Sequence, residues 1–144
     1  MTRVLKVRRR LGTEDLPLPQ YMSAHAAGLD LHAANEEPIA IAPGEIKLIP
    51  TGLYVEIPVG YEGQVRARSG LALRHGLMLP NAPGTIDADY RGELQVILAN
   101  CGPEPYTISR GMRFAQLVIS PVSGIMKNEP MPRGAIAIPA CSDG

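Results

Sequence analysis

The sequence contains no tryptophan and a single phenylalanine, and aromatic residues make up only 4% of it. A hydrophobic core must therefore be built from aliphatic side chains. The two cysteines, Cys101 and Cys141, are too few and too far apart to form a disulfide framework or a zinc site. The formal net charge is zero, so the charge balance does not indicate a surface that binds a polyanion or a membrane. We expect neither a nucleic-acid partner nor a membrane partner.

The first ten residues lack the apolar segment of a secretory signal, and no stretch approaches the length that spans a membrane. We therefore expect a cytoplasmic, reduced protein. The only local run of basic residues is Arg8, Arg9 and Arg10. A solvated strand end explains this run best, because no aromatic residues are interleaved with it as they are in phosphate-tracking nucleic-acid sites.

Glycine and proline are abundant, at 15 and 14 of the 144 residues, whereas 45% of the chain is hydrophobic. Residues that break helices and form turns, spaced eight to twelve positions apart, are typical of an all-β protein. We predict one domain over residues 1–122, a jelly-roll-like β-barrel or sandwich. Residues 123–144 contain three prolines, shortly after Pro121, and scattered glycines, which predicts an extended arm that is exchanged within an oligomer.

Two local details follow from the same pattern. Residues 47–49 and 53–57 read as two separate strands. Residues 69–75 are the one segment predicted to be helical, with Ser69 capping the start and Gly76 ending the helix.

Polar residues gather at two places beside predicted strands. The segment Ala-Gly-Leu-Asp-Leu at 27–31 puts the Asp30 carboxylate at a strand end, although an exposed turn aspartate is the commoner explanation. The segment Arg-Ala-Arg-Ser-Gly-Leu at 66–71 leaves a strand for a helical turn. Backbone N–H groups, a hydroxyl and a guanidinium at such a point can bind an anion. A plain helix cap with a surface arginine is an equally good explanation for this second segment.

A third polar segment covers residues 81–92, Asn-Ala-Pro-Gly-Thr-Ile-Asp-Ala-Asp-Tyr-Arg-Gly. We predict a β-hairpin here, with its tip at residues 89–92 and a return strand at 93–99. Free backbone edges of a hairpin can pair with a nucleobase as they pair with another strand. Asp87 and Ile86 point to opposite faces, so one of them faces a pocket, and Tyr90 could lie under a sugar. A hairpin with a polar tip and no ligand remains the alternative.

Together these segments resemble, in order and spacing, the signature motifs of the trimeric dUTPase family. The first three family motifs are similar to residues 27–31, 68–72 and 84–92, and the fourth is similar to Gly-Met-Arg-Phe-Ala-Gln-Leu at 111–117. The resemblance runs from about Pro17 to Val122, most of the chain. Four ordered motifs are a specific match.

The resemblance implies hydrolysis of dUTP to dUMP and pyrophosphate by a homotrimer. Asp87 matches the general base that activates the attacking water, and Tyr90 matches the ring under the deoxyribose. Asp30 matches a carboxylate near the water shell of Mg²⁺, a cofactor held by the triphosphate without direct protein ligands. The remaining matches are to substrate-binding residues: Arg68, Ser69, Gly70 and Gln116 for the phosphates, Asn81, Thr85 and Ile86 for uracil, and Gln95 for a further contact.

The C-terminal motif departs from the family. That motif is a glycine-rich tail with an arginine that meets the γ-phosphate and an aromatic ring that covers the uracil. Arg133 and Gly134 match its start, but the glycine run is missing, and the only phenylalanine, Phe114, belongs to the fourth motif. We therefore expect turnover to be weakened by an incomplete lid.

Two other functions stay open on the sequence alone. A dCTP deaminase of the same fold carries a catalytic glutamate on the strand after the third motif, where this chain has Ile97. A nucleotide binder without hydrolysis, or a trimeric interaction protein, would fit the altered tail. A pure binder would have no use for Asp87, so hydrolysis is favoured.

Overall fold

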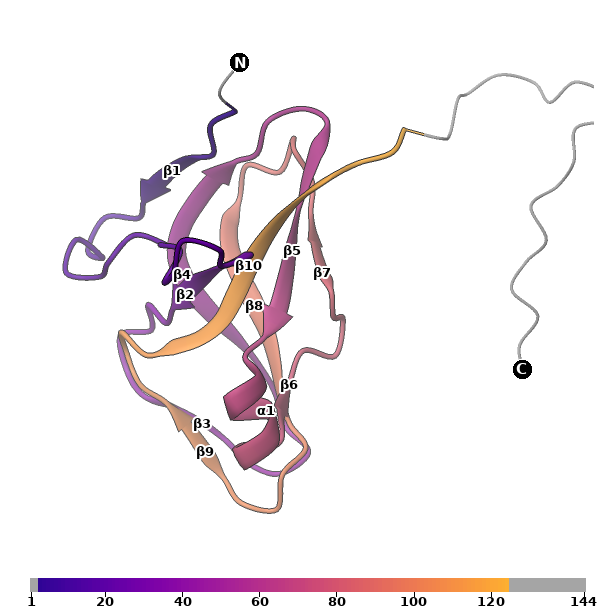
Figure 1. Ribbon diagram of the computed structural model, residues 1–144. Coiled ribbons are helices and arrows are strands. Elements are labelled where there is room, and N and C mark those ends of the chain that lie inside the picture. The colour runs from indigo at the N-terminus through magenta and orange to yellow at the C-terminus, as the bar shows by residue number, and fades with distance from the viewer. Residues whose placement is uncertain (1–2, 125–144) are drawn as a thin grey trace, which may run out of the picture.

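The computed structural model describes residues 3–124, and this part of the chain is built almost entirely of β-strands (Figure 1). Its elements in chain order are β1 (Lys6–Arg9), β2 (Gly28–His32), β3 (Ile39–Ile41), β4 (Ile46–Glu56), β5 (Tyr61–Ala67), α1 (Ser69–His75), β6 (Leu77–Met78), β7 (Gly84–Ile86), β8 (Glu93–Asn100), β9 (Tyr106–Ile108) and β10 (Arg113–Pro121). The predicted all-β, jelly-roll-like fold with one short helix is confirmed. The predicted boundary at residue 122 stays a prediction, because residues 125–144 lie outside the described part.

The strands form two four-stranded sheets and a two-stranded ribbon. One sheet has the order β1-β4-β8-β6, the other has the order β2-β10-β5-β7, and β3 pairs with β9. Neighbouring strands in all three are antiparallel. In Figure 1, β8 of the first sheet passes behind β10, β1 of the same sheet lies at the upper left, and α1 lies below the end of β5. No helix among residues 3–124 is long and apolar enough to cross a membrane.

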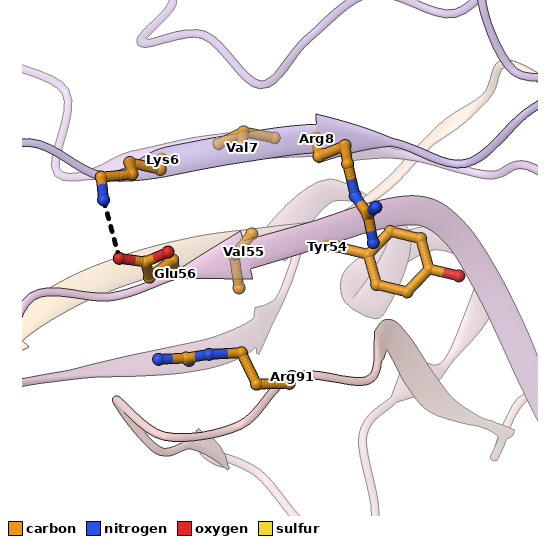
Figure 2. Close-up of a pocket in the computed structure, with 7 residues that line it drawn as sticks. All are labelled: Lys6, Val7, Arg8, Tyr54, Val55, Glu56 and Arg91. Atoms are coloured by element: carbon orange, nitrogen blue, oxygen red, sulfur yellow. Dashed lines mark hydrogen bonds and ion pairs between the residues drawn. The ribbon is translucent and has the colours of Figure 1, made fainter.

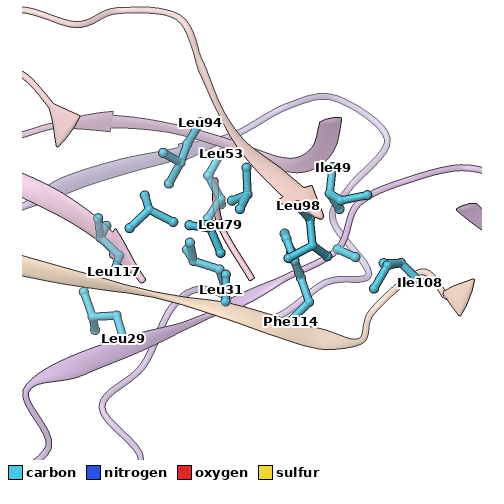
Figure 3. Packing of buried hydrophobic residues seen from close by; sticks show 14 of the residues in the cluster. Leu29, Leu31, Ile49, Leu53, Leu79, Leu94, Leu98, Ile108, Phe114 and Leu117 are labelled. Carbon is cyan, nitrogen blue, oxygen red and sulfur yellow. The ribbon is translucent and has the colours of Figure 1, made fainter. Parts of the chain in front are cut away.

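The core between the sheets is aliphatic, as the shortage of aromatic residues predicts (Figure 3). Strand β8 shows the period-two pattern that produces it, because Leu94, Val96 and Leu98 are buried whereas Gln95 and Ile97 are exposed. Phe114, the single phenylalanine, is only 1% exposed and belongs to this core. The phenylalanine ring therefore packs within the hydrophobic core.

Two predicted details of the secondary structure are wrong. The two strands expected at 47–49 and 53–57 are one strand, β4, whose pairing with β8 shifts register between Pro50 and Leu53. A β-bulge of this kind bends a strand without ending it. Ser69 is the first residue of α1 and not its cap, since the N-cap is Arg68, which makes no side-chain capping hydrogen bond. Gly76 does end the helix in the left-handed conformation, at φ 68°.

The predicted hairpin at residues 81–92 is also wrong. Strand β7 pairs with β5 in one sheet, and β8 pairs with β4 and β6 in the other. The segment between them turns, with the Tyr90 N–H donating to the Asp87 carbonyl at 3.1 Å, and crosses from sheet to sheet. Turn residues between two strands predict a reversal, but they do not determine whether the second strand returns to the same sheet.

Candidate functional site

The phosphate residues expected from the sequence meet where β2, β5 and β10 run together. Gln116 of β10 pairs across the sheet with Asp30 of β2 on one side and with Arg66 of β5 on the other. Arg68 follows the end of β5, and Arg113 begins β10. We call Asp30, Arg68, Arg113 and Gln116 the arginine cluster.

Ion pairs and hydrogen bonds fix the side chains of the arginine cluster. The Asp30 carboxylate is 3.3 Å from Nη1 of Arg113 and 3.8 Å from Nε of Arg68, and its side chain is only 14% exposed. Arg68 Nη1 also donates to the Arg113 carbonyl at 3.0 Å. Gln116 Nε2 donates to the Ala67 carbonyl at 3.1 Å. The two guanidiniums are thereby held side by side with one carboxylate between them, an arrangement that leaves excess positive charge for an anion.

A glycine leaves room at one position beside this cluster. A Cβ atom on Gly28 would collide with Oε1 of Gln116, so any larger residue at 28 must displace that amide. Gly28 lies in the first motif as the first residue of β2. Its role is therefore to leave room for the side chain of Gln116 on the adjacent strand.

The start of α1 adds further donors on the same side. Ser69 is exposed and opens the helix, and Gly70 is partly exposed beside it. The first turn has no acidic residue and no side-chain cap, so its backbone N–H groups are not occupied by the helix itself. Small residues here let an anion come close to the backbone.

Two residues in this region were not predicted from the sequence as site residues. Arg113 and His32 line a pocket of about 290 Å³ next to Asp30. Burial lowers the pKa of His32 from its ordinary value, and the positive charges of Arg113 and Arg68 lower it further, against the opposing effect of Asp30. Arg113 could have been noticed as a basic residue three positions before Gln116, but its partner Asp30 depends on strand pairing that the sequence does not specify.

The residues expected to read uracil, and Gln95, the expected further substrate contact, come together at a second place, the strand-edge pocket. This small pocket of about 40 Å³ lies between the β6–β7 connection, β7 and β8. Its lining includes all four expected residues: Asn81, Thr85, Ile86 and Gln95. Gln95 lies on β8, whereas the other three residues lie on β7 or on the connection before it. Only the fold brings these three residues next to Gln95.

The backbone of β7 gives this pocket its chemical character. Strand β7 is the last strand of its sheet and pairs on one side only, with β5. An unpaired strand edge presents alternating N–H and C=O groups that a planar heterocycle can pair with as another strand would. The pocket lining holds no charged side chain, so recognition here depends on the pattern of donors and acceptors.

Asp87 and Tyr90 lie beside the strand-edge pocket and not in its wall. Asp87 is exposed directly after β7. Tyr90 is 42% exposed, and its hydroxyl donates to the Glu93 carbonyl at 2.8 Å. The ring lies so close to Gly92 that a Cβ there would meet the Tyr90 hydroxyl. The tyrosine ring is therefore held in one orientation with a face open to solvent.

The two halves of the candidate site are far apart in one chain. Ile86, next to Asp87, pairs with Gly63 of β5. Arg68 is five residues further along the extended chain from Gly63, which corresponds to about 16 Å at the rise of a β-strand. The backbone at Asp87 therefore lies well away from Arg68 of the same chain.

Comparison with known proteins gives one consistent answer. A sequence model of the family described as dUTPase matches residues 14–135. The deoxyuridine 5'-triphosphate nucleotidohydrolase of Aquifex aeolicus (strain VF5) is 61% identical over 122 residues, which cover 85% of this chain and 81% of that protein. The protein of the same name from Anaeromyxobacter sp. (strain Fw109-5) is 61% identical over 116 residues, or 79% and 78% of the two chains.

This chain belongs to the dUTPase family. Solved structures of dUTPases agree with the fold at lower identity. A mutant dUTPase from phage phi11 of S. aureus, described with a structural Mg(II) ion, superposes with a TM-score of 0.74 at 28% identity, covering 89% of this chain and 97% of its own. A mutant of the Staphylococcus bacteriophage 80alpha dUTPase with dUpNHpp gives 0.76 at 26% identity, covering 92% and 99%.

The described residues of this dUTPase-family chain contain no group of three or more histidine, cysteine, aspartate or glutamate side chains that could hold a metal ion. Asp30, the acid expected near the metal, already faces two arginines. A single carboxylate in this position could contact the water shell of a magnesium ion that is bound through substrate phosphates. Arg133, the residue expected to meet the γ-phosphate, lies outside the described residues.

Proposed function

We propose that this chain hydrolyses dUTP to dUMP and pyrophosphate, with uracil bound in the strand-edge pocket and the phosphates bound by the arginine cluster. The observation that carries the proposal is the strand-edge pocket itself. In it, the three residues that the family resemblance assigns to uracil and Gln95, assigned to a further substrate contact, line one neutral hollow beside an unpaired strand edge. Membership of the dUTPase family supports the same substrate.

Base selection would come from the backbone of β7 around Thr85 and Ile86. Uracil has one N–H between two carbonyls, a pattern that a strand edge complements. Cytosine replaces one carbonyl by an amine and would bring a donor against a donor. Asn81, whose Nδ2 lies beside Gly84, and Gln95 would satisfy the remaining polar edge of the base. Tyr90 would lie under the deoxyribose and leave no room for a 2′-hydroxyl.

We propose Asp87 as the general base. It would accept a proton from a water molecule that attacks the α-phosphorus, with pyrophosphate as the leaving group. This mechanism needs no covalent nucleophile. Arg68, Ser69, Gly70 and Gln116 would orient the triphosphate and neutralise its charge. Mg²⁺ bound by the phosphates would supply further neutralisation, with Asp30 near its water shell.

The separation of about 16 Å along β5 between Arg68 and Gly63, which pairs with Ile86 next to Asp87, supports a site shared between chains. We propose that a second copy brings its Asp87 to the arginine cluster of the first. A suitable contact surface lies on the outer face of the β1-β4-β8-β6 sheet. Ile46, Leu48, Met78 and Ile97 are 37–60% exposed there, on positions that neighbour one another in the register of β4, β6 and β8.

This apolar face continues into the strand-edge pocket, because Ile97 belongs to both. An exposed apolar face next to an incomplete site is expected where a second copy completes the site. We propose the homotrimer that the family resemblance implies. Ile97 also speaks against a dCTP deaminase, since its side chain has no acid or base group at the pocket wall.

A panel of nucleotides assayed for pyrophosphate release tests the proposed function. We expect dUTP to yield dUMP and pyrophosphate, and we expect dCTP and UTP to yield neither at a comparable rate. Asp87→Asn is the control for a contaminating phosphatase, because it should abolish most of the signal from the same preparation. Purified chain that binds dUTP but releases no pyrophosphate would instead support a nucleotide binder.

A further inference from the structure

A further pocket is lined by basic side chains that the dUTPase chemistry does not use. It has a volume of about 270 Å³ and lies between β1, β4 and the segment that crosses from β7 to β8. Lys6, Arg8 and Arg91 line it together with Tyr54 and Glu56 (Figure 2). We call it the β1 pocket. It shares no lining residue with the strand-edge pocket or with the pocket at Asp30.

The three consecutive arginines at positions 8–10 have different surroundings in the structure. Of the three, only Arg8 lines the β1 pocket, and its guanidinium has no oxygen partner among the described residues. Arg9 donates to the Leu16 carbonyl at 3.2 Å, and Arg10 forms an ion pair with Glu93 at 2.7 Å. Arg8 instead lies over the ring of Tyr54, 4.6 Å from its centroid. Within residues 3–124, no carboxylate lies within ion-pair distance of the Arg8 guanidinium.

Arg91 approaches the β1 pocket from the opposite side of β4 (Figure 2). Its Nη1 donates to the carbonyls of Ala88 and Tyr90 at 2.8 and 3.1 Å. These two bonds fix the plane of the guanidinium. The donors on its Nε and Nη2 have no hydrogen-bond partner in the described part of the chain. A guanidinium held in place with unused donors is organised to accept an anion at little entropic cost.

The one acid in the β1 pocket does not neutralise these arginines. Glu56 forms an ion pair with Lys6 at 2.9 Å, so its charge is matched by that lysine first. Arg91 also lies close enough to help lower the pKa of Glu56, but one carboxylate against three cations leaves excess positive charge around a hollow large enough for a small molecule. The face of Tyr54 is already covered by Arg8, and that ring face cannot also stack a nucleobase. The chemistry therefore favours an anion without an aromatic ring.

We propose that the β1 pocket binds a small tetrahedral oxyanion of the phosphate class, such as inorganic phosphate or pyrophosphate, between Arg8 and Arg91. A guanidinium fork matches the oxygen spacing of phosphate, whereas a halide offers it a single point of contact. The site is separate from the arginine cluster. Its occupancy does not depend on whether dUTP is hydrolysed.

Titration of the full-length chain with inorganic phosphate, followed by amide NMR at constant ionic strength, tests the proposal. We expect saturable shifts at residues 6–8, 54–56 and 91, absent when chloride replaces phosphate. The same shifts should persist in Arg68→Gln, which weakens phosphate binding at the proposed catalytic site. This variant separates the two sites, so failure of one proposal leaves the other standing.

Arg8→Gln and Arg91→Gln should each weaken phosphate binding at the β1 pocket about tenfold or more, because each loses charge-assisted hydrogen bonds. Arg3→Gln is the matched control. Arg3 also lies over a tyrosine ring, 4.7 Å from the centroid of Tyr61, but it does not line the pocket, so its loss should change nothing. Phosphate shifts that equal those of chloride, or that survive in both Arg8→Gln and Arg91→Gln, would overturn the proposal.

Discussion

The arginine cluster and the strand-edge pocket differ in the kind of group that each can bind. The arginine cluster is charged, and ion pairs of 3.3 and 3.8 Å to Asp30 hold its two guanidiniums in place. The strand-edge pocket has no charged lining residue and depends on an unpaired strand and two amide side chains. The first suits an anion of any nucleotide, whereas the second can discriminate between bases. Selectivity should therefore come from the strand edge, and phosphate affinity should come from the cluster.

The largest expected effect concerns the choice of base and sugar. A site that satisfies hydrogen bonds of its substrate rejects an analogue that cannot make them by roughly 10⁴ or more. We expect kcat/KM for dCTP to fall below that for dUTP by about this factor, since the strand edge would face an extra donor. UTP should be rejected as well if Tyr90 blocks the 2′ position. Comparable turnover of UTP and dUTP would rule out that role for Tyr90.

Asp87→Asn separates chemistry from binding. The amide keeps the size of the side chain but cannot accept the proton, and loss of general-base help costs about 10²–10⁴ in rate. We expect kcat to fall by this amount while dUTP still binds, which calorimetry can measure. Asp89→Asn is the matched control, since Asp89 is an exposed aspartate two residues away. Equal losses in both variants would argue against a specific role for Asp87.

A smaller effect is expected from Gly28→Ala, which acts on the arginine cluster alone. The new Cβ would displace the Gln116 amide and remove one contact to the phosphates. We expect KM for dUTP to rise about three- to tenfold, the equivalent of one hydrogen bond, with selectivity between bases unchanged. Gly124→Ala is the control, because a Cβ there meets no atom within 4 Å. An unchanged KM in Gly28→Ala would remove Gln116 from the phosphate set.

The smallest expected effect concerns how the free energy of unfolding depends on pH. It arises from His32, which lies beside the arginine cluster. Burial and the neighbouring arginines lower the pKa of His32 in the folded chain below its ordinary value of 6.5. The unfolded chain then binds more protons than the folded chain below that pH, so the free energy of unfolding decreases as pH falls from about 6.5. Above about pH 6.5, the contribution of neutral His32 to the free energy of unfolding is fully present. Urea unfolding between pH 5 and 8 should show a shallower dependence in His32→Gln.

The sequence predicted the local elements of the fold better than the arrangement of these elements in sheets. Local patterns were sufficient for the all-β fold, for the helix at residues 69–75 and for its end at Gly76, because turn residues and burial periodicity act over a few positions. The supposed hairpin at 81–92 was wrong because sheet partners are chosen by the whole core. Arg113 and His32 were missed for the same reason, since both owe their place beside Asp30 to pairing between β2 and β10.

The central claim is that one complete site needs the Asp87 of one chain and the arginine cluster of another. It can be tested by mixing two inactive variants, Asp87→Asn and Arg68→Gln, denaturing them together and refolding them as mixed oligomers. If sites are shared between chains, random assembly should restore about a quarter of the wild-type activity, while each variant refolded alone stays nearly inactive. Mixed oligomers that form, as detected by differently tagged chains, yet regain no activity would contradict the account.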